Sequence, residues 1–170
     1  MFTWRITKYD PKNRDSRGVY LLNEWTAYSD IDKVIAGKSL NYTQYLAVEN
    51  AYVNVINLFM VCNQLRELSV STLEKKLDLI NDPNLNPLMV NLFKRIKRGL
   101  RLSREEIDAV SRLVLRDELW CIIESVDIMR VRFDWDYYMY IGSANKCDDV
   151  IYKIQQSGLF VEACDPEYLE

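Results

Sequence analysis

Three pairs of closely spaced aspartates could support chemistry in this chain: Asp134 with Asp136, Asp30 with Asp32, and Asp148 with Asp149. A D-x-D pair supplies the oxygen ligands that Mg²⁺ takes in some phosphoryl-transfer sites. One interpretation is therefore a metal-dependent enzyme that processes RNA or nucleotides, with Asp134 and Asp136 holding the metal. Two carboxylates are too few to define a catalytic site, and sequence spacing places no third carboxylate, lysine or histidine beside them.

The chain contains no histidine, which removes the commonest general base and the commonest metal ligand. The motifs G-x-G-x-x-G, P-loop and G-x-S-x-G are also absent. The four cysteines, Cys62, Cys121, Cys147 and Cys164, form no Cys-x-x-Cys pair, so a zinc site would need four thiolates from distant segments. We therefore expect no cofactor, no metal and no catalysis, with cysteines that stay reduced and act as small buried hydrophobic residues.

The composition is that of an ordinary globular protein, with 49% hydrophobic and 28% charged residues in a chain of 170. A chain of this length buries roughly two thirds of its unfolded surface, so we expect one globular domain over residues 1–170. The N-terminus has no apolar run of signal-peptide length, and no segment approaches the ~20 apolar residues of a membrane span. We therefore expect a cytoplasmic protein without a membrane partner.

Hydrophobic periodicity and turn chemistry predict an α+β fold: a mainly antiparallel sheet with one long helix and several shorter helices packed on it. The predicted strands are residues 2–9, 68–73, 119–124, 128–133, 137–142 and 160–163. The predicted helices are residues 43–65, 87–99, 104–117 and 148–156. Thr43 is expected to cap the first of these helices, and a capping box of Ser103 and Glu106 the third.

The stretch RFDWDYYMYIG, residues 132–142, alternates apolar and polar side chains as a strand with one buried face does. The residues expected to face the core are Phe133, Trp135, Tyr137, Met139 and Ile141. Residues 128–142 fit either one long strand or a hairpin that turns at residues 134–136. Aspartate is a poor strand residue and a good turn residue, so we favour the hairpin.

The negative charge of the chain is concentrated at its C-terminal end. Residues 133–170 contain eight acids and two bases, whereas the whole chain has a net charge of −3. Tyrosine offers a large contact area at small entropic cost, and aspartate pairs with Arg or Lys of a partner. The residues that we predict to form a docking face for a basic protein are Asp134, Asp136, Tyr138, Tyr140, Asp148 and Asp149.

A run of bases between Lys94 and Arg104 could contact phosphates, and would guide the substrate of an RNA-processing enzyme. Apolar residues are interleaved with these bases, however, which favours an amphipathic element with its bases outside. A free-standing nucleic-acid binder usually has a basic isoelectric point, and this chain's is about 5.2. We therefore expect no direct nucleic-acid partner.

The stretches FTWRITKYDPKNRD, NEWTAYSDI, LWCIIE and DYYMYIG resemble small bacterial immunity proteins of contact-dependent inhibition and polymorphic toxin systems. The resemblance covers both ends of the chain and the segment from Tyr45 to Phe59. It implies a non-catalytic cytoplasmic protein that binds a toxin domain, often a basic nuclease attacking tRNA or other RNA, and blocks its active site or substrate surface. A scaffold that binds some other protein is a third interpretation.

Overall fold

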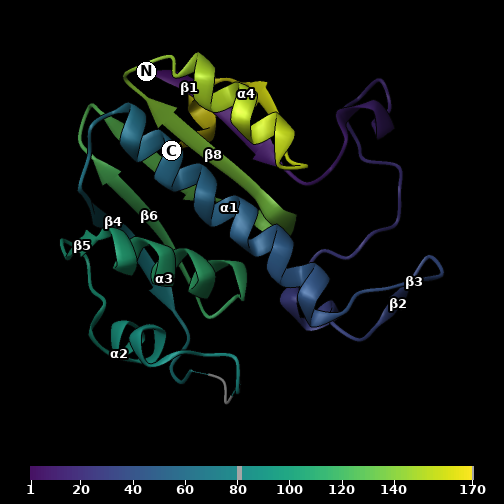
Figure 1. The fold of residues 1–170 in the computed structure, drawn as a ribbon, viewed down its shortest axis with the longest axis horizontal. Coiled ribbons are helices and arrows are strands. Elements are labelled where there is room, and N and C mark those ends of the chain that lie inside the picture. The colour runs from purple at the N-terminus through teal and green to yellow at the C-terminus, as the bar shows by residue number, and fades with distance from the viewer. Residues whose placement is uncertain (80–81, 170) are drawn as a thin grey trace.

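The computed structural model describes residues 1–79 and 82–169, and within them helices cover one face of a seven-stranded antiparallel sheet (Figure 1). The strand order is β5-β4-β6-β7-β8-β1-β9. The strands are β1 (Phe2–Thr7), β4 (Glu67–Lys75), β5 (Arg101–Ser103), β6 (Leu119–Ser125), β7 (Met129–Phe133), β8 (Tyr138–Ser143) and β9 (Phe160–Ala163), with a separate pair β2 (Val34–Ile35) and β3 (Lys38–Ser39). The helices are α1 (Tyr42–Cys62), α2 (Pro87–Arg95), α3 (Arg104–Leu115) and α4 (Asp148–Gln156). This architecture confirms the predicted α+β fold.

The two longest helices begin at side chains that satisfy free backbone amides. Helix α1 starts one residue earlier than predicted because Asn41, and not Thr43, caps it. The Asn41 carboxamide oxygen accepts the Gln44 amide at 2.9 Å, and the Gln44 side chain accepts the Asn41 amide at 3.0 Å. The predicted box of Ser103 and Glu106 is confirmed at the start of α3. Both helices therefore begin where reciprocal side-chain bonds replace the missing backbone partners.

Both helices end two or three residues before the predicted ends, and for the same reason. Gln64 after α1 and Asp117 after α3 have positive φ angles of 56° and 61°, which a continuing helix cannot adopt. The next amide in each case, that of Leu65 or Glu118, bonds back to a carbonyl of the last turn. This left-handed cap closes a helix, and it occurs here without the usual glycine.

Six strands, β1, β4, β6, β7, β8 and β9, follow the prediction closely, whereas β2, β3 and β5 were not predicted. Strand β1 stops at Thr7 instead of residue 9, and β4 covers Glu67–Lys75, with a bulge between Val70 and Thr72.

Helix α4 and strand β9 have the predicted bounds. Helix α2 begins at Pro87 as predicted but ends before Gly99, because Ile96 is extended and turns its side chain into the core. The six bases between Lys94 and Arg104 are exposed, as expected.

Helix α1 lies over the sheet, along the direction of β6 and β8, and supplies the centre of the core (Figure 1). Tyr45, Tyr52 and Phe59 on this helix are fully buried. Among the described residues, α1 is the single helix whose length and apolar composition would allow it to cross a membrane. That finding corrects the expectation that no segment approaches such a span, although here the apolar face of α1 packs against the sheet and the other helices.

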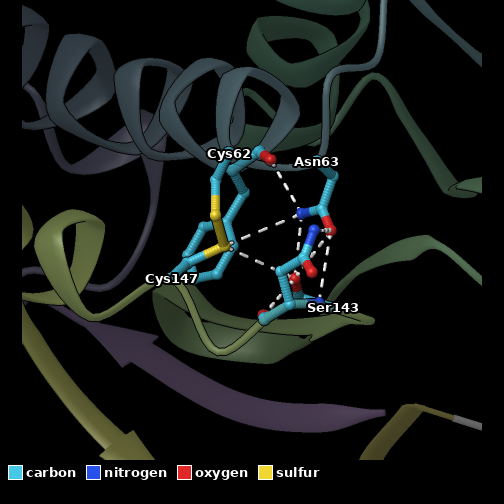
Figure 2. Close-up of a disulfide and its surroundings, with 6 residues drawn as sticks. Cys62, Asn63, Ser143 and Cys147 are labelled. Atoms are coloured by element: carbon cyan, nitrogen blue, oxygen red, sulfur yellow. Dashed lines mark hydrogen bonds between the residues drawn. A yellow bond between two sulfur atoms is a disulfide. The ribbon is translucent and has the colours of Figure 1, made fainter.

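A disulfide joins Cys62, the last residue of α1, to Cys147, just before α4 (Figure 2). It corrects the expectation that these two cysteines are separate thiols, because the fold brings their Cα atoms to 6.0 Å across 85 residues of sequence. Cys121 and Cys164 are free. Burial raises the pKa of the Cys121 thiol to about 12, as expected of a cysteine that serves as a small hydrophobic side chain.

Candidate functional site

Residues 128–142 form a hairpin, which confirms the preferred interpretation of this stretch. Strands β7 and β8 pair with Phe133 opposite Met139, and the Asp134 amide donates to the Tyr138 carbonyl at 2.8 Å. The turn between them is a short 3₁₀ segment, η3 (Trp135–Tyr137). The acidic and aromatic residues singled out in the sequence therefore lie at a hairpin end and not along a continuous strand.

The turn sends Trp135 outward, contrary to the prediction that it faces the core. Asp136 and Tyr137 have φ angles of 55° and 62°, so the alternation of a regular strand is lost here. The Trp135 side chain is 82% exposed, whereas Phe133 and Met139 on the flanking strands are buried as predicted. A large aromatic ring thus stands in solvent with an aspartate on either side of it.

Buried hydrogen bonds hold this turn in its left-handed conformation. The Tyr137 hydroxyl donates to the Leu115 carbonyl at 2.8 Å and lies 3.2 Å from the Tyr45 hydroxyl. The Tyr52 hydroxyl donates to the Tyr137 carbonyl at 2.5 Å, and the Trp25 ring meets the Tyr137 ring edge-on at 4.9 Å. A left-handed non-glycine residue costs on the order of 1–3 kcal/mol. These contacts offset that cost and hold the backbone of the turn that carries Trp135.

Three of the six predicted docking residues meet at this hairpin. The Asp134 carboxylate accepts the Trp135 amide at 2.9 Å and lies 3.8 Å from the Arg132 guanidinium. Asp136 is exposed. Tyr138 is half-buried, and its ring centroid lies 5.6 Å from that of Tyr9.

The other three predicted residues lie elsewhere. Tyr140 is only 5% exposed, because its ring stacks on Tyr168 of the C-terminal turn η4 (Pro166–Leu169) at 5.0 Å. The expectation that Tyr140 lies on an open face is therefore wrong. Asp148 and Asp149 are exposed at the start of α4, beyond the far end of β8. The length of β8 separates the two aspartate pairs by roughly 17 Å at 3.3–3.4 Å per residue.

Two hollows flank Trp135, of about 240 and 440 Å³. The exposed or half-exposed acids on their walls are Glu74 from the end of β4, Asp117 from the turn after α3, Asp134 and Asp136, and the buried Glu118 also lines the larger hollow. The exposed or half-exposed bases are Lys76, which pairs with Asp117 at 3.2 Å, and Arg132. We call the surface formed by Glu74, Asp117, Asp134, Trp135 and Asp136 the Trp135 edge. Sequence reasoning missed Glu74 and Asp117 because only the sheet brings them to the hairpin.

A buried ionic network lies behind the larger hollow. The Glu49 carboxylate on α1 is completely buried and accepts Nε and Nη2 of Arg116 at 2.7 and 2.9 Å. Arg112 also donates to Glu49, and Arg116 lies over the Tyr28 ring and 3.6 Å from Asp82. These bonds join α1 and α3 to the loops that wall the hollow. Because the Glu49 charge is compensated by bonds to two guanidinium groups, we assign the network a structural role.

The described residues give the metal-dependent interpretation no set of ligands. Over residues 1–79 and 82–169, no group of three or more His, Cys, Asp or Glu side chains lies close enough to hold a metal ion. Asp134 is occupied by the Trp135 amide and by Arg132. In this fold Asp134 bonds within the turn and Asp136 is exposed.

No protein-family model matches this chain, and comparison with curated proteins and with solved structures likewise found no match.

Proposed function

We propose that this chain is a non-catalytic cytoplasmic immunity protein that binds and neutralises a cognate toxin domain, a basic nuclease that acts on tRNA or other RNA. The Trp135 edge is the docking surface. The observation that carries the proposal is the 82% exposure of Trp135 between Asp134 and Asp136 on a turn held by buried bonds. Tryptophan is among the residues most enriched at the energetic centres of protein interfaces.

The charge of the edge favours a basic partner. Four acids and two bases line the hollows around Trp135 at the exposed or half-exposed positions. Carboxylates attract a basic protein from a distance and repel the phosphates of nucleic acid, so the nuclease and not its RNA substrate is the expected ligand. Association is expected to slow as salt is added, because exposed charges are screened within about 8 Å at physiological ionic strength.

Rigidity of the edge supports the same proposal. An inhibitor whose binding residues are already ordered loses little conformational entropy when it binds. Tyr137, buried beneath the turn, is bonded to Leu115 and Tyr52 and packed against Trp25, so Trp135 is presented on a fixed support. Occlusion of a nuclease active site by such a surface needs no bond to be made or broken.

Co-expression with the product of the neighbouring toxin gene tests the proposal through growth rescue and co-purification. We expect wild type to rescue growth and Asp134→Lys/Asp136→Lys to lose both rescue and co-purification with an unchanged melting temperature. The matched control is Asp148→Lys/Asp149→Lys, the exposed pair at the other end of β8. Loss of rescue in the control alone would move the docking surface to α4, and failure of wild type to rescue would overturn the proposed function.

A further inference from the structure

We propose that the Cys62–Cys147 disulfide is a thiol-exchange site, attacked at the Cys62 sulfur by a low-molecular-weight thiol of the glutathione class. A hollow of about 470 Å³ beside the disulfide is lined by both cysteines and by residues of α1 and α4. Cys62 is half-buried, whereas Cys147 is only 9% exposed. The hollow gives a small thiol access to the bond from the Cys62 side.

The two sulfurs lie at opposite kinds of helix end. Cys62 is the last residue of the 21-residue helix α1, where the carbonyl ends of the helix disfavour a negative charge. Cys147 occupies the N-cap position of the nine-residue helix α4, and its side chain bonds to no backbone amide there, but the positive end of the helix dipole favours a thiolate at this position. Because a thiolate of lower pKa leaves faster, this asymmetry makes Cys147 the better leaving group and Cys62 the sulfur that is attacked.

Polar side chains around Cys147 strengthen this asymmetry (Figure 2). The Asn63 side-chain nitrogen lies 3.8 Å from the Cys147 sulfur, and the Ser143 hydroxyl lies 3.7 Å from it. Asn63 is itself fixed by a bond to the Phe59 carbonyl at 2.8 Å. Asn63 and Ser143 are therefore the polar groups that lie beside the sulfur that would carry the negative charge after exchange. In the disulfide form their hydrogens are directed at the oxygens of Phe59, Ser143 and Asn145.

Charged residues near the start of α4 largely cancel one another. Asp148 and Asp149 follow Cys147 and oppose a thiolate there, but Lys146 pairs with Asp148 at 3.0 Å and Lys153 lines the same hollow. The groups that make Cys147 a better leaving thiolate than Cys62 are therefore the helix end, Asn63 and Ser143.

The exchange balances in two steps. A thiolate forms a bond to the Cys62 sulfur while the Cys62–Cys147 bond breaks, and the electron pair leaves on Cys147 as a thiolate. A second thiol then attacks the mixed disulfide, which releases Cys62 as a thiolate and the two small thiols as their disulfide. The protein disulfide gains two electrons, and the low-molecular-weight thiol is the reductant.

The test uses the full chain with Cys164→Ser, which removes the half-buried free thiol, after oxidation with glutathione disulfide. The folded protein is treated briefly with reduced glutathione, quenched with acid, and mapped by mass spectrometry. We expect the glutathione adduct on Cys62 in several-fold excess over Cys147. An adduct mainly on Cys147, a Cys62–Cys147 disulfide that does not form, or exchange that occurs only in denaturant would each overturn the proposal.

A pair of serine variants tests the role of the polar groups. The Ser143 hydroxyl donates to the Asn145 carbonyl and the Ser157 hydroxyl to the Ile154 carbonyl, each at 2.7 Å. Ser143 also accepts the Asn63 side-chain nitrogen at 2.8 Å, so the melting temperature of each variant is measured beside its exchange rate. Only Ser143 faces the sulfur. We expect Ser143→Ala to slow exchange several-fold and Ser157→Ala to leave the rate unchanged. Equal rates in both variants would contradict the assignment of Cys147 as the leaving thiolate.

Discussion

The Glu49 carboxylate and the Arg116 guanidinium form a two-pronged ion pair in the interior, with both nitrogen–oxygen distances below 3.0 Å. The two residues are 67 positions apart in the sequence, so their spacing does not reveal the pair. The Arg116 side chain also reaches the Asn84 carbonyl at 3.1 Å. One buried arginine thus links the central helix, α3 and the loop before α2.

Removal of Arg116 is expected to destabilise the fold strongly. Arg116→Met leaves the Glu49 charge buried without its main partner, which costs about 3–5 kcal/mol. The double variant Glu49→Met/Arg116→Met removes both charges, so it is expected to recover much of that loss. Urea unfolding of the three proteins measures the difference. A double variant no more stable than Arg116→Met would show that the packing of Arg116, and not its charge, is what the fold requires.

Trp135→Ala is expected to separate binding from stability. The ring is exposed, so the free energy of unfolding should change by no more than about 0.5 kcal/mol. Binding of the toxin should weaken by about 2 kcal/mol, roughly thirtyfold in Kd, if the ring is the centre of the interface. Calorimetry with the purified toxin domain measures the second quantity and thermal melting the first.

Tyr152→Ala is the matched control for that substitution. Tyr152 on α4 is 65% exposed and lies away from the hairpin. Its removal should alter neither the melting temperature nor the affinity. If wild type rescues growth but Trp135→Ala binds the toxin with unchanged affinity, the proposed immunity function is retained. The Trp135 edge is then not the docking surface.

Stability is expected to fall steeply as the pH rises above about 10, the ordinary pKa of tyrosine. Burial raises the pKa of Tyr9, Tyr45, Tyr52 and Tyr137 in the fold, and burial with the bond to Asp82 raises that of Tyr28 to about 12. Above pH 10 the unfolded chain therefore binds fewer protons than the folded chain, and the free energy of unfolding decreases. Below pH 10 these groups are protonated in both states and have no such effect.

Tyr137→Phe removes one of these titrating groups, so the free energy of unfolding should decrease less steeply with pH above pH 10 than it does in wild type. The measurement is urea unfolding at a series of pH values, with tyrosinate absorbance to follow ionisation. The comparison with wild type uses the slope against pH, so the loss of the Tyr137 hydrogen bonds in the variant does not affect it. An unchanged slope would contradict the assignment of Tyr137 as a group that resists ionisation in the folded state.

Opening the disulfide is expected to lower stability without abolishing the fold. A cross-link between residues 85 positions apart lowers the conformational entropy of the unfolded chain. This effect stabilises the folded state by up to about 4–5 kcal/mol. Urea unfolding with and without reductant should show this loss in wild type. Cys62→Ser/Cys147→Ser should already show it and should not respond to reductant. A response of the double variant would implicate Cys121 or Cys164 instead.

The ends of the helices show how far the sequence can be interpreted locally. The capping box at Ser103 involves residues three apart, so its chemistry is visible in the sequence and the structure confirms it. Glycine marks left-handed caps in most helices, and here Gln64 and Asp117 take that conformation instead. Their side chains carry no strong local signal, and the predicted ends were therefore too late.

At the hairpin, the alternation of side chains was a sound guide wherever the chain is a strand. Phe133, Met139 and Ile141 are buried as expected. Trp135 does not follow the alternation, because the two residues after it in the turn are left-handed. That conformation depends on bonds from Tyr137 to residues of α1 and α3. Tyr140 lies on the predicted polar face but is buried, because the C-terminal turn covers that face of the sheet.

The sequence by itself determined the α+β class, most of the strands and helices, the acidic C-terminal third and the hairpin at residues 134–136. Those features depend on periodicity, capping and turn preferences, which act between residues a few positions apart. Only the tertiary structure decided that Trp135 points outward, that Glu49 meets Arg116, and that Cys62 pairs with Cys147. Each of these depends on the packing of segments that are distant in sequence, and no local preference encodes which distant side chain will lie opposite another.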